Sequence, residues 1–381
     1  MIYNDGKLCI EEVSDIHLGH HKTTTKEILD ALRVAFPNTA RLAEIDLLII
    51  AGDVFDRLLQ LPDDNVIEIR IWMNDFLRAC KKWDVVVRCL EGTPSHDWKQ
   101  CKHFVAENES SQIGADFKYH STLCIEYIEK FDMHLLFIPD EWKHDTDDTW
   151  LDVKRTMSEH GLDMVDITVM HGAFAYQLPP HVPSPTHDPA RYISITRYVV
   201  FVGHIHKHSV FDIIISAGSF DRLTHGEEEP KGHVRVVLTS DGKMNITFIE
   251  NKQAKLYITV TCTGLDMAES LEKLKFVDDL PKGSQIRIRS NKRDVIWTSA
   301  DALKERFGHV VFTFQEDDKD KIKHRPITEM VKPHTSGEIT DSNIRELLMK
   351  RLEELTGGQD FDMKRAGELI DDQLLSSGRF S

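Results

Sequence analysis

Nine short apolar runs recur in the first 250 residues, and they constrain the fold more than any other feature of the chain. The runs are rich in Val, Ile and Leu and are bounded by polar residues, which is typical of strands buried on both faces. Helical patterns at 25–35, 66–82 and 149–159 lie between several of them. This alternation predicts an α/β fold in which helices cover sheets. The runs are 9–14, 46–52, 84–90, 133–139, 166–172, 198–204, 212–218, 234–239 and 245–250.

A shorter β-α-β-α-β pattern follows and predicts a small α+β domain at 255–316. The polar stretch at 317–340 predicts a linker, and the last segment, 341–381, is predicted to be helical. Within that segment one face of the predicted helix 341–356 is apolar. It carries Ile344, Leu347, Leu348, Leu352 and Leu355. A large domain at 1–254 precedes these three parts.

The chain is acidic, with 47 Lys and Arg against 63 Asp and Glu and a net charge of -16. A protein that binds DNA by itself usually has a basic surface. A nucleic-acid substrate would therefore require positive charge from bound metal ions, from a local basic patch or from a partner subunit.

The cysteines and the N-terminus indicate a cytoplasmic protein. None of the six cysteines forms a C-x-x-C pair, and the N-terminus has no secretory pattern, so we expect reduced thiols. No apolar stretch approaches the roughly 18 residues of a membrane helix, so we expect a soluble protein without membrane contact.

Five clusters of His and Asp stand at the C-terminal ends of predicted strands, where the loops of an open α/β sheet converge on ligands. In D-x-H and H-x-H the outer residues point to the same side of an extended segment, so each pair can bind one ion. The carboxylate of Asp53 has two oxygens and can bridge two metal ions. Mixed Asp and His ligands suit Mn, Fe or Zn better than Ca or Mg. The clusters supply Asp15, His17, Asp53, His96, His171, His204 and His206.

Each cluster by itself has an ordinary structural explanation, since G-D and D-x-H are common in turns and helix caps. The five together, in this order, favour a two-metal site. Asp56 is interpreted as structural, either as a helix cap or as a hydrogen-bond partner of His17.

The order D-x-H, G-D-x-x-D, S-H-D, H-G, G-H-x-H resembles the calcineurin-like metallophosphoesterase superfamily over about residues 7–250. Within it the chain resembles SbcD-type DNA double-strand-break repair nuclease subunits, above all phage-encoded ones. The shared features are the long helical insertion after G-D-V-F-D, the segment 216–233 with its Gly-Ser, acidic and Lys-Gly elements, and the small α+β cap. The resemblance implies a two-sheet sandwich flanked by helices.

The resemblance also implies a role for each motif residue. Asp15, His17 and His206 would bind one metal, Asp53 would bridge, and His171 and His204 would bind the second. His96 would meet the leaving oxygen, and Asp97 would orient His96. Where the family has an Asn ligand this chain has Ser95, so the second metal is expected to use Ser95, Thr93 or water.

The implied activity is metal-dependent hydrolysis of DNA, as an exonuclease on duplex ends and an endonuclease on single strands, in DNA repair, recombination or phage DNA metabolism. Two divalent ions are expected, with Mn²⁺ first and Fe, Zn or Mg as alternatives. The implied partners are DNA and an SbcC-like coiled-coil ATPase, in a complex that contains a homodimer. The resemblance favours binding of the ATPase by the C-terminal helix, and the alternative is that this helix folds back onto the cap domain. Trp98 either stacks on an unpaired base or packs in the core.

Two other functions remain open. One is a small-molecule phosphodiesterase or phosphatase, against which the segment 216–233 and the cap domain argue. The other is a scaffold with weakened catalysis, which only Ser95 favours.

Overall fold

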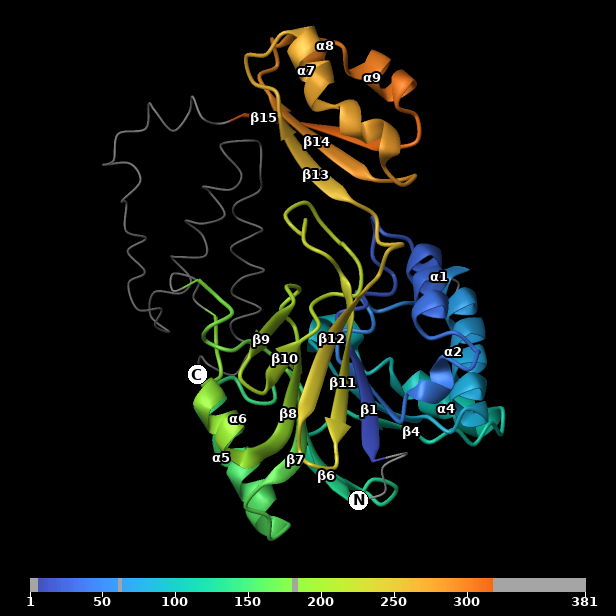
Figure 1. The fold of residues 1–381 in the computed structure, drawn as a ribbon, viewed down its shortest axis with the longest axis vertical. Coiled ribbons are helices and arrows are strands. Elements are labelled where there is room, and N and C mark those ends of the chain that lie inside the picture. Colours follow the sequence, from blue (N-terminus) through green and yellow to red (C-terminus); the bar gives the residue numbers. More distant parts are fainter. Residues whose placement is uncertain (1–5, 61–63, 180–183, 318–381) are drawn as a thin grey trace, which may run out of the picture. The chain divides into compact units, whose positions relative to one another are not determined.

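The computed structural model describes residues 6–60, 64–179 and 184–317. Two six-stranded sheets flanked by helices, together with a separate three-stranded sheet, confirm the predicted α/β class (Figure 1). The first sheet is ordered β12 (Met244–Glu250), β11 (Gly232–Thr239), β1 (Lys7–Val13), β2 (Leu47–Ala51), β3 (Val86–Leu90), β4 (Phe117–His120). The second is ordered β5 (Cys124–Ile128), β6 (Met133–Ile138), β7 (Val165–His171), β8 (Thr196–Gly203), β10 (Ile214–Ser216), β9 (Ser209–Phe211).

The central strands of both sheets are parallel. In the first sheet β1, β2, β3 and β4 run the same way, and β11 and β12 add antiparallel partners at one side. In the second, β6, β7, β8 and β10 are parallel, and β5 and β9 are antiparallel edges. The loops that leave the parallel strands therefore emerge at one edge of each sheet, which is where ligands bind in α/β folds.

The two sheets pack on each other through alternate residues of their strands. In β2, Leu47 and Ile49 belong to the core between the sheets, while Leu48 and Ile50 pack on the helical side. The helices on that side are α1 (Thr25–Ala35), α2 (Asp64–Lys82) and α4 (Lys102–Ser110), and a short η1 (Leu42–Glu44) leads into β2. A strand covered on both faces has to be apolar throughout, which explains the unbroken run in the sequence.

The second sheet is covered in the same way on its outer face. Val153 of α5 (Thr146–Glu159) and Tyr192 of α6 (Pro189–Ile195) belong to the same buried cluster as Leu136 and Val200 of the sheet. The order of layers is thus helix, sheet, sheet, helix. Among the described helices, none is both long and apolar enough to cross a membrane.

The third sheet is a parallel β13 (Tyr257–Thr261), β14 (Gln285–Ser290), β15 (Val311–Glu316) with helices between its strands. These are α7 (Met267–Lys273), η2 (Lys275–Asp279), α8 (Val295–Thr298) and α9 (Ala300–Arg306). The β-α-β-α-β order matches the expectation for 255–316. The chain has one compact unit at Met1–Glu316 and a second at Asp317–Ser381, so a boundary near 254 stays a prediction. Apart from Asp317, the predicted linker at 317–340 lies outside the described residues, and so does the predicted helical segment at 341–381.

Candidate metal centre

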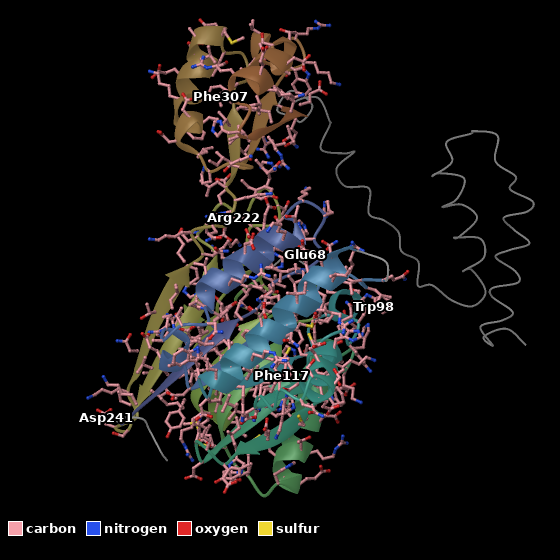
Figure 2. The ribbon with its side chains drawn as sticks, turned by 90° about the vertical axis from the view of Figure 1, so that its right-hand side faces the viewer. Glu68, Trp98, Phe117, Arg222, Asp241 and Phe307 are labelled. Carbon is pink, nitrogen blue, oxygen red and sulfur yellow. The ribbon has the colours of Figure 1, made fainter. Side chains whose placement is uncertain are left out.

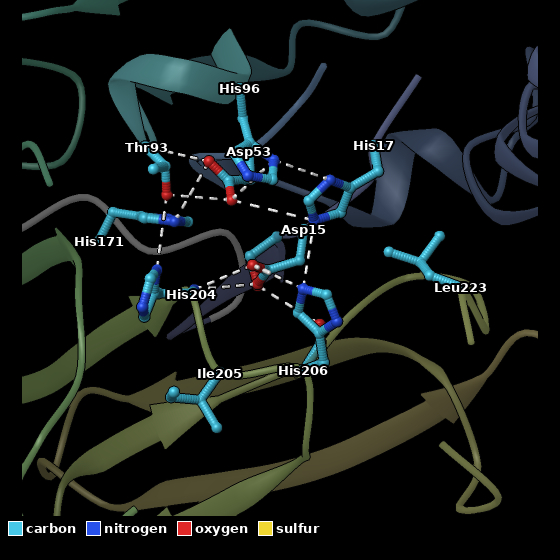
Figure 3. A network of polar contacts seen from close by, with 12 residues as sticks. Asp15, His17, Asp53, Thr93, His96, His171, His204, Ile205, His206 and Leu223 are labelled. Atoms are coloured by element: carbon cyan, nitrogen blue, oxygen red, sulfur yellow. Dashed lines mark hydrogen bonds and ion pairs between the residues drawn. The ribbon is translucent and has the colours of Figure 1, made fainter. Parts of the chain in front are cut away.

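Loops from five parallel strands bring His and Asp side chains into one cluster (Figure 3). β1 and β2 deliver residues from the first sheet, as does β3 through α3 (Pro94–Asp97), and β7 and β8 deliver residues from the second. Three groups have ligand atoms within 4.8 Å of one another, and each can bind a metal ion. They are Asp15–His17–His206, His17–Asp53–His96 and Asp53–His171–His204.

Asp53 belongs to two of the three groups, and His17 joins one of these to the group Asp15–His17–His206. Its Oδ1 lies 3.4 Å from His171 Nε2, and its Oδ2 lies 3.9 Å from both His17 Nε2 and His96 Nδ1. Burial opposes ionisation of Asp53, but the charges of His171, His17 and His96 hold its pKa below the usual range. An ionised carboxylate with one oxygen toward each group has the position that a bridging ligand needs.

In the first group two imidazoles face each other, with His17 Nε2 3.2 Å from His206 Nε2. Their outer nitrogens are held by carboxylates, since His17 Nδ1 lies 3.2 Å from Asp56 Oδ1 and His206 Nδ1 lies 3.0 Å from Glu227 Oε1. A carboxylate behind a histidine fixes the tautomer that presents a lone pair to a metal. Asp56 therefore holds the ring of His17, which is the second of the two structural roles expected for it.

Glu227 was not predicted, because nothing in its spacing marks it in the sequence. Burial opposes its ionisation, but the hydrogen bond with His206 and the charge of Lys231 lower its pKa to about 2. Lys231 is buried, and its Nζ donates to the carbonyl oxygen of His206 at 2.7 Å. The acidic and Lys-Gly elements of segment 216–233 thus hold His206 in place.

In the group Asp53–His171–His204, His171 is buried, and its Nδ1 donates to the carbonyl of Ala51 at 2.7 Å. In that tautomer Nε2 is an acceptor, and it has no hydrogen-bond partner among the described residues. Nε2 lies 3.4 Å from Asp53 Oδ1. Burial opposes protonation of His171, but the charges of Asp53, Asp15 and Asp140 raise its pKa, so these carboxylates stabilise a positive charge at this point, and a bound cation can take the place of the proton.

The backbone at the strand ends is strained. Asp15, His17, Asp53 and His204 have φ of 50°, 55°, 49° and 98°, a region that residues other than Gly rarely adopt. Such residues cost on the order of 1–3 kcal/mol each and gather at functional sites. Gly52 is required for a related reason, because an added Cβ would lie 2.3 Å from His171 Nδ1. The strain is offset by packing elsewhere, and it turns the side chains toward a common point.

His96 lies on α3 beside these groups, half-exposed, with Nδ1 3.3 Å from His17 Nδ1. Asp97 follows it but is fully buried, and its two oxygens accept hydrogen bonds from the backbone of Phe55 (2.9 Å) and Gly92 (2.7 Å). Its described contacts therefore join the loops after β2 and β3. Burial and the charge of Asp53 raise the pKa of Asp97 to about 8.

The structure distinguishes the two residues proposed for the missing Asn. Ser95 is exposed, and its carbonyl accepts the indole N–H of Trp98 at 2.7 Å. Thr93 instead lies at the cluster, where its N–H donates to Asp53 Oδ1 at 2.6 Å and its hydroxyl is 3.5 Å from His204 Nδ1. This geometry places Thr93 rather than Ser95 beside the group Asp53–His171–His204.

Trp98 ends α3 with a φ of 50° and is 53% exposed, so it lies on the surface and not in the core (Figure 2). A second unpredicted acid, Asp140, lies 3.5 Å from His204 Nδ1. It follows the strand predicted at 133–139, so its position at the end of a strand is a signal that was available in the sequence. No spaced partner marks it as part of a motif.

No protein-family model matches the chain, and no curated protein matches it. Two solved structures with some likeness are TT1561 of Thermus thermophilus and GAP50, the anchor in the inner membrane complex of Plasmodium. The first is 12% identical and covers 63% of this chain and 98% of its own, with a TM-score of 0.38. The second is 15% identical and covers 66% of this chain and 86% of its own, with a TM-score of 0.40. Neither likeness bears on the chemistry of the site.

Proposed function

We propose that the chain is a two-metal-dependent phosphodiesterase that hydrolyses DNA, as an SbcD-like exonuclease and endonuclease subunit in DNA repair, recombination or phage DNA metabolism. The observation that carries the proposal is that Asp53 belongs to two adjacent groups, one with His17 and His96 and the other with His171 and His204. A lone metal site needs no shared carboxylate. Two adjacent sites suit a phosphodiester, whose attacking and leaving oxygens both need stabilisation.

The residues that would hold the ions are Asp15, His17 and His206 on one side, His171 and His204 on the other, and Asp53 between them. Two divalent cations, Mn²⁺ above all, supply acidification of a water molecule and neutralisation of phosphate charge. His96 is half-exposed beside these residues and protonates the departing oxygen. Asp56 and Glu227 keep the imidazoles of His17 and His206 in their orientations.

Trp98 supports nucleic acid as the substrate. It is exposed two residues from His96 and offers a face on which an unpaired base stacks. The net charge of -16 is unfavourable for binding DNA alone, so a partner supplies the basic surface. We propose an SbcC-like coiled-coil ATPase that binds the segment 341–381, in a complex that contains two copies of this chain.

A small phosphoester is the second candidate substrate, because a cavity of about 380 Å³ opens beside His204. That volume lies in the range of ordinary ligand pockets. Trp142, Lys143, His144 and His187 are among the residues that line it.

A comparison of substrates tests the proposal. The purified chain is assayed with Mn²⁺ on linear duplex, supercoiled plasmid and single-stranded DNA, and on p-nitrophenyl phosphate and its bis ester. We expect cleavage of DNA and of the bis ester, and loss of both in Asp53→Ala but not in Asp75→Asn, which changes an exposed residue of α2. Rapid hydrolysis of p-nitrophenyl phosphate without any cleavage of DNA would contradict the nuclease proposal and support a phosphatase.

A further inference from the structure

Asp140 is the acidic residue nearest to His204 that the proposed function does not use. It follows β6 by two residues, and its side chain is 11% exposed. Its Oδ2 lies 3.5 Å from His204 Nδ1 and 3.0 Å from Thr93 Oγ1. We infer that Asp140 and the Thr93 hydroxyl are ligands of the second metal, in the place that the sequence left to Ser95. The inference rests on the proposed two-metal function and adds two ligands to it.

The hydroxyl of Thr93 lies among two carboxylates and an imidazole. Besides Asp140 Oδ2 and His204 Nδ1, it lies 3.3 Å from Asp53 Oδ2 (Figure 3 shows the contacts with Asp53 and His204). A hydroxyl has a single proton to donate, so at most one of the two carboxylates receives it. The other carboxylate oxygen lacks that proton, and a cation bound beside Thr93 would satisfy it.

The separations among Asp140, Thr93 and His204 are in the range for ligands of a single ion. Donors with bonds of about 2.1 Å lie about 3.0 Å apart when they are at right angles around a metal and about 4.2 Å apart when they are opposite. The four separations involving Asp140, Thr93, His204 and Asp53 are 3.0, 3.3, 3.5 and 3.5 Å. The fifth, from His171 Nε2 to Asp53 Oδ1, is 3.4 Å. All of them fall between the two limits.

The carboxylate of Asp140 is held in this orientation by its own loop. Its second oxygen, Oδ1, accepts the backbone N–H of Glu141 at 2.9 Å, and Glu141 has a φ of 47°. Oδ2 is thereby left directed at Thr93 and His204. A ligand fixed before the ion binds loses less conformational entropy on binding.

The exchange of a neutral ligand for a carboxylate changes the charge of the second site. Asp53 shares its negative charge between the two ions, so the carboxylate of Asp140 adds a full negative charge at the second ion that an Asn or Ser ligand would not supply. The added carboxylate and hydroxyl oxygens also favour Mn²⁺ over Zn²⁺ relative to a site built on His alone. The second ion is therefore held firmly even though Ser95 does not contribute.

The test is a Mn²⁺ titration followed by electron paramagnetic resonance, which reports free Mn²⁺ and any coupling between bound ions. We expect two coupled ions in the wild-type chain. Asp140→Ala should weaken one ion at least tenfold and abolish the coupling, as His171→Ala does. Asp140→Asn keeps the shape of the side chain and should also weaken that ion, so a folding defect of the Ala variant leaves the test intact. Glu141→Gln, which removes the neighbouring charge at an exposed position, should match wild type.

Two coupled ions with unchanged affinity in both Asp140 variants would overturn the assignment and leave the proposed function standing. A wild-type chain that binds no Mn²⁺ would overturn both.

Discussion

The substitution Asp97→Ala tests which of two roles Asp97 has: joining the loops after β2 and β3, or orienting His96. Asp97 is fully buried and accepts hydrogen bonds from the backbone N–H groups of Phe55 and Gly92. Alanine leaves both donors buried without an acceptor, and each such donor costs about 1–3 kcal/mol. We therefore expect the free energy of unfolding to fall by about 2–6 kcal/mol, a large part of the stability of a typical domain.

The assay is urea unfolding of the metal-free chain, with the slope of the transition checked for each variant. Asp75→Ala is the matched control, because an exposed position on α2 should change stability by no more than about 0.5 kcal/mol. Mn²⁺ affinity should fall together with stability, since the joined loops carry Asp53 and Thr93. If Asp97→Ala is as stable as wild type and only its rate of DNA hydrolysis falls, this reasoning is refuted. Asp97 would then act by orienting His96.

Three further predictions concern single residues. His96→Ala should keep both ions while DNA hydrolysis slows by around 10² to 10⁴, the range for lost general acid catalysis, and unchanged turnover would assign the proton to another group. Glu227→Gln should weaken one Mn²⁺ by about 10- to 100-fold in the same titration, because His206 loses the charge behind its ring. In metal-free protein the raised pKa of Asp97 means that the folded state binds an extra proton between about pH 4 and 8. Wild type should therefore lose up to about 1.4 kcal/mol of stability per pH unit over that range relative to Asp97→Asn, and parallel pH profiles would contradict it.

The sequence predicts the buried part of the fold well. The helix expected at 25–35 is α1 (Thr25–Ala35), and the run at 133–139 is β6 within one residue. The strands it misses are β4, β5 and β9, which lie at sheet edges and mix charged or aromatic residues with apolar ones. An edge strand is half exposed and needs no continuous apolar run, so the pattern that marks central strands is absent.

The sequence likewise predicts some residues of the site and misses others. Residues in spaced pairs, such as Asp15 and His17, are visible because an extended strand end turns both toward one side. Asp140 follows a predicted strand but has no spaced partner, and Glu227 comes from a loop, so only the tertiary structure shows that they lie near His204 and His206. The roles of Thr93 and Ser95 depend on the turn of α3, which a short motif does not encode.

Metal content of wild type and Asp53→Ala is the most direct test of the central claim, that two ions share one carboxylate at this site. Elemental analysis after loading with Mn²⁺ and removal of free metal, with DNA hydrolysis measured on the same samples, gives both quantities at once. We predict two ions and metal-dependent cleavage for wild type, and loss of most of the metal and all of the cleavage in the variant. Two ions retained by Asp53→Ala, or cleavage by wild type after complete chelation, would contradict the account.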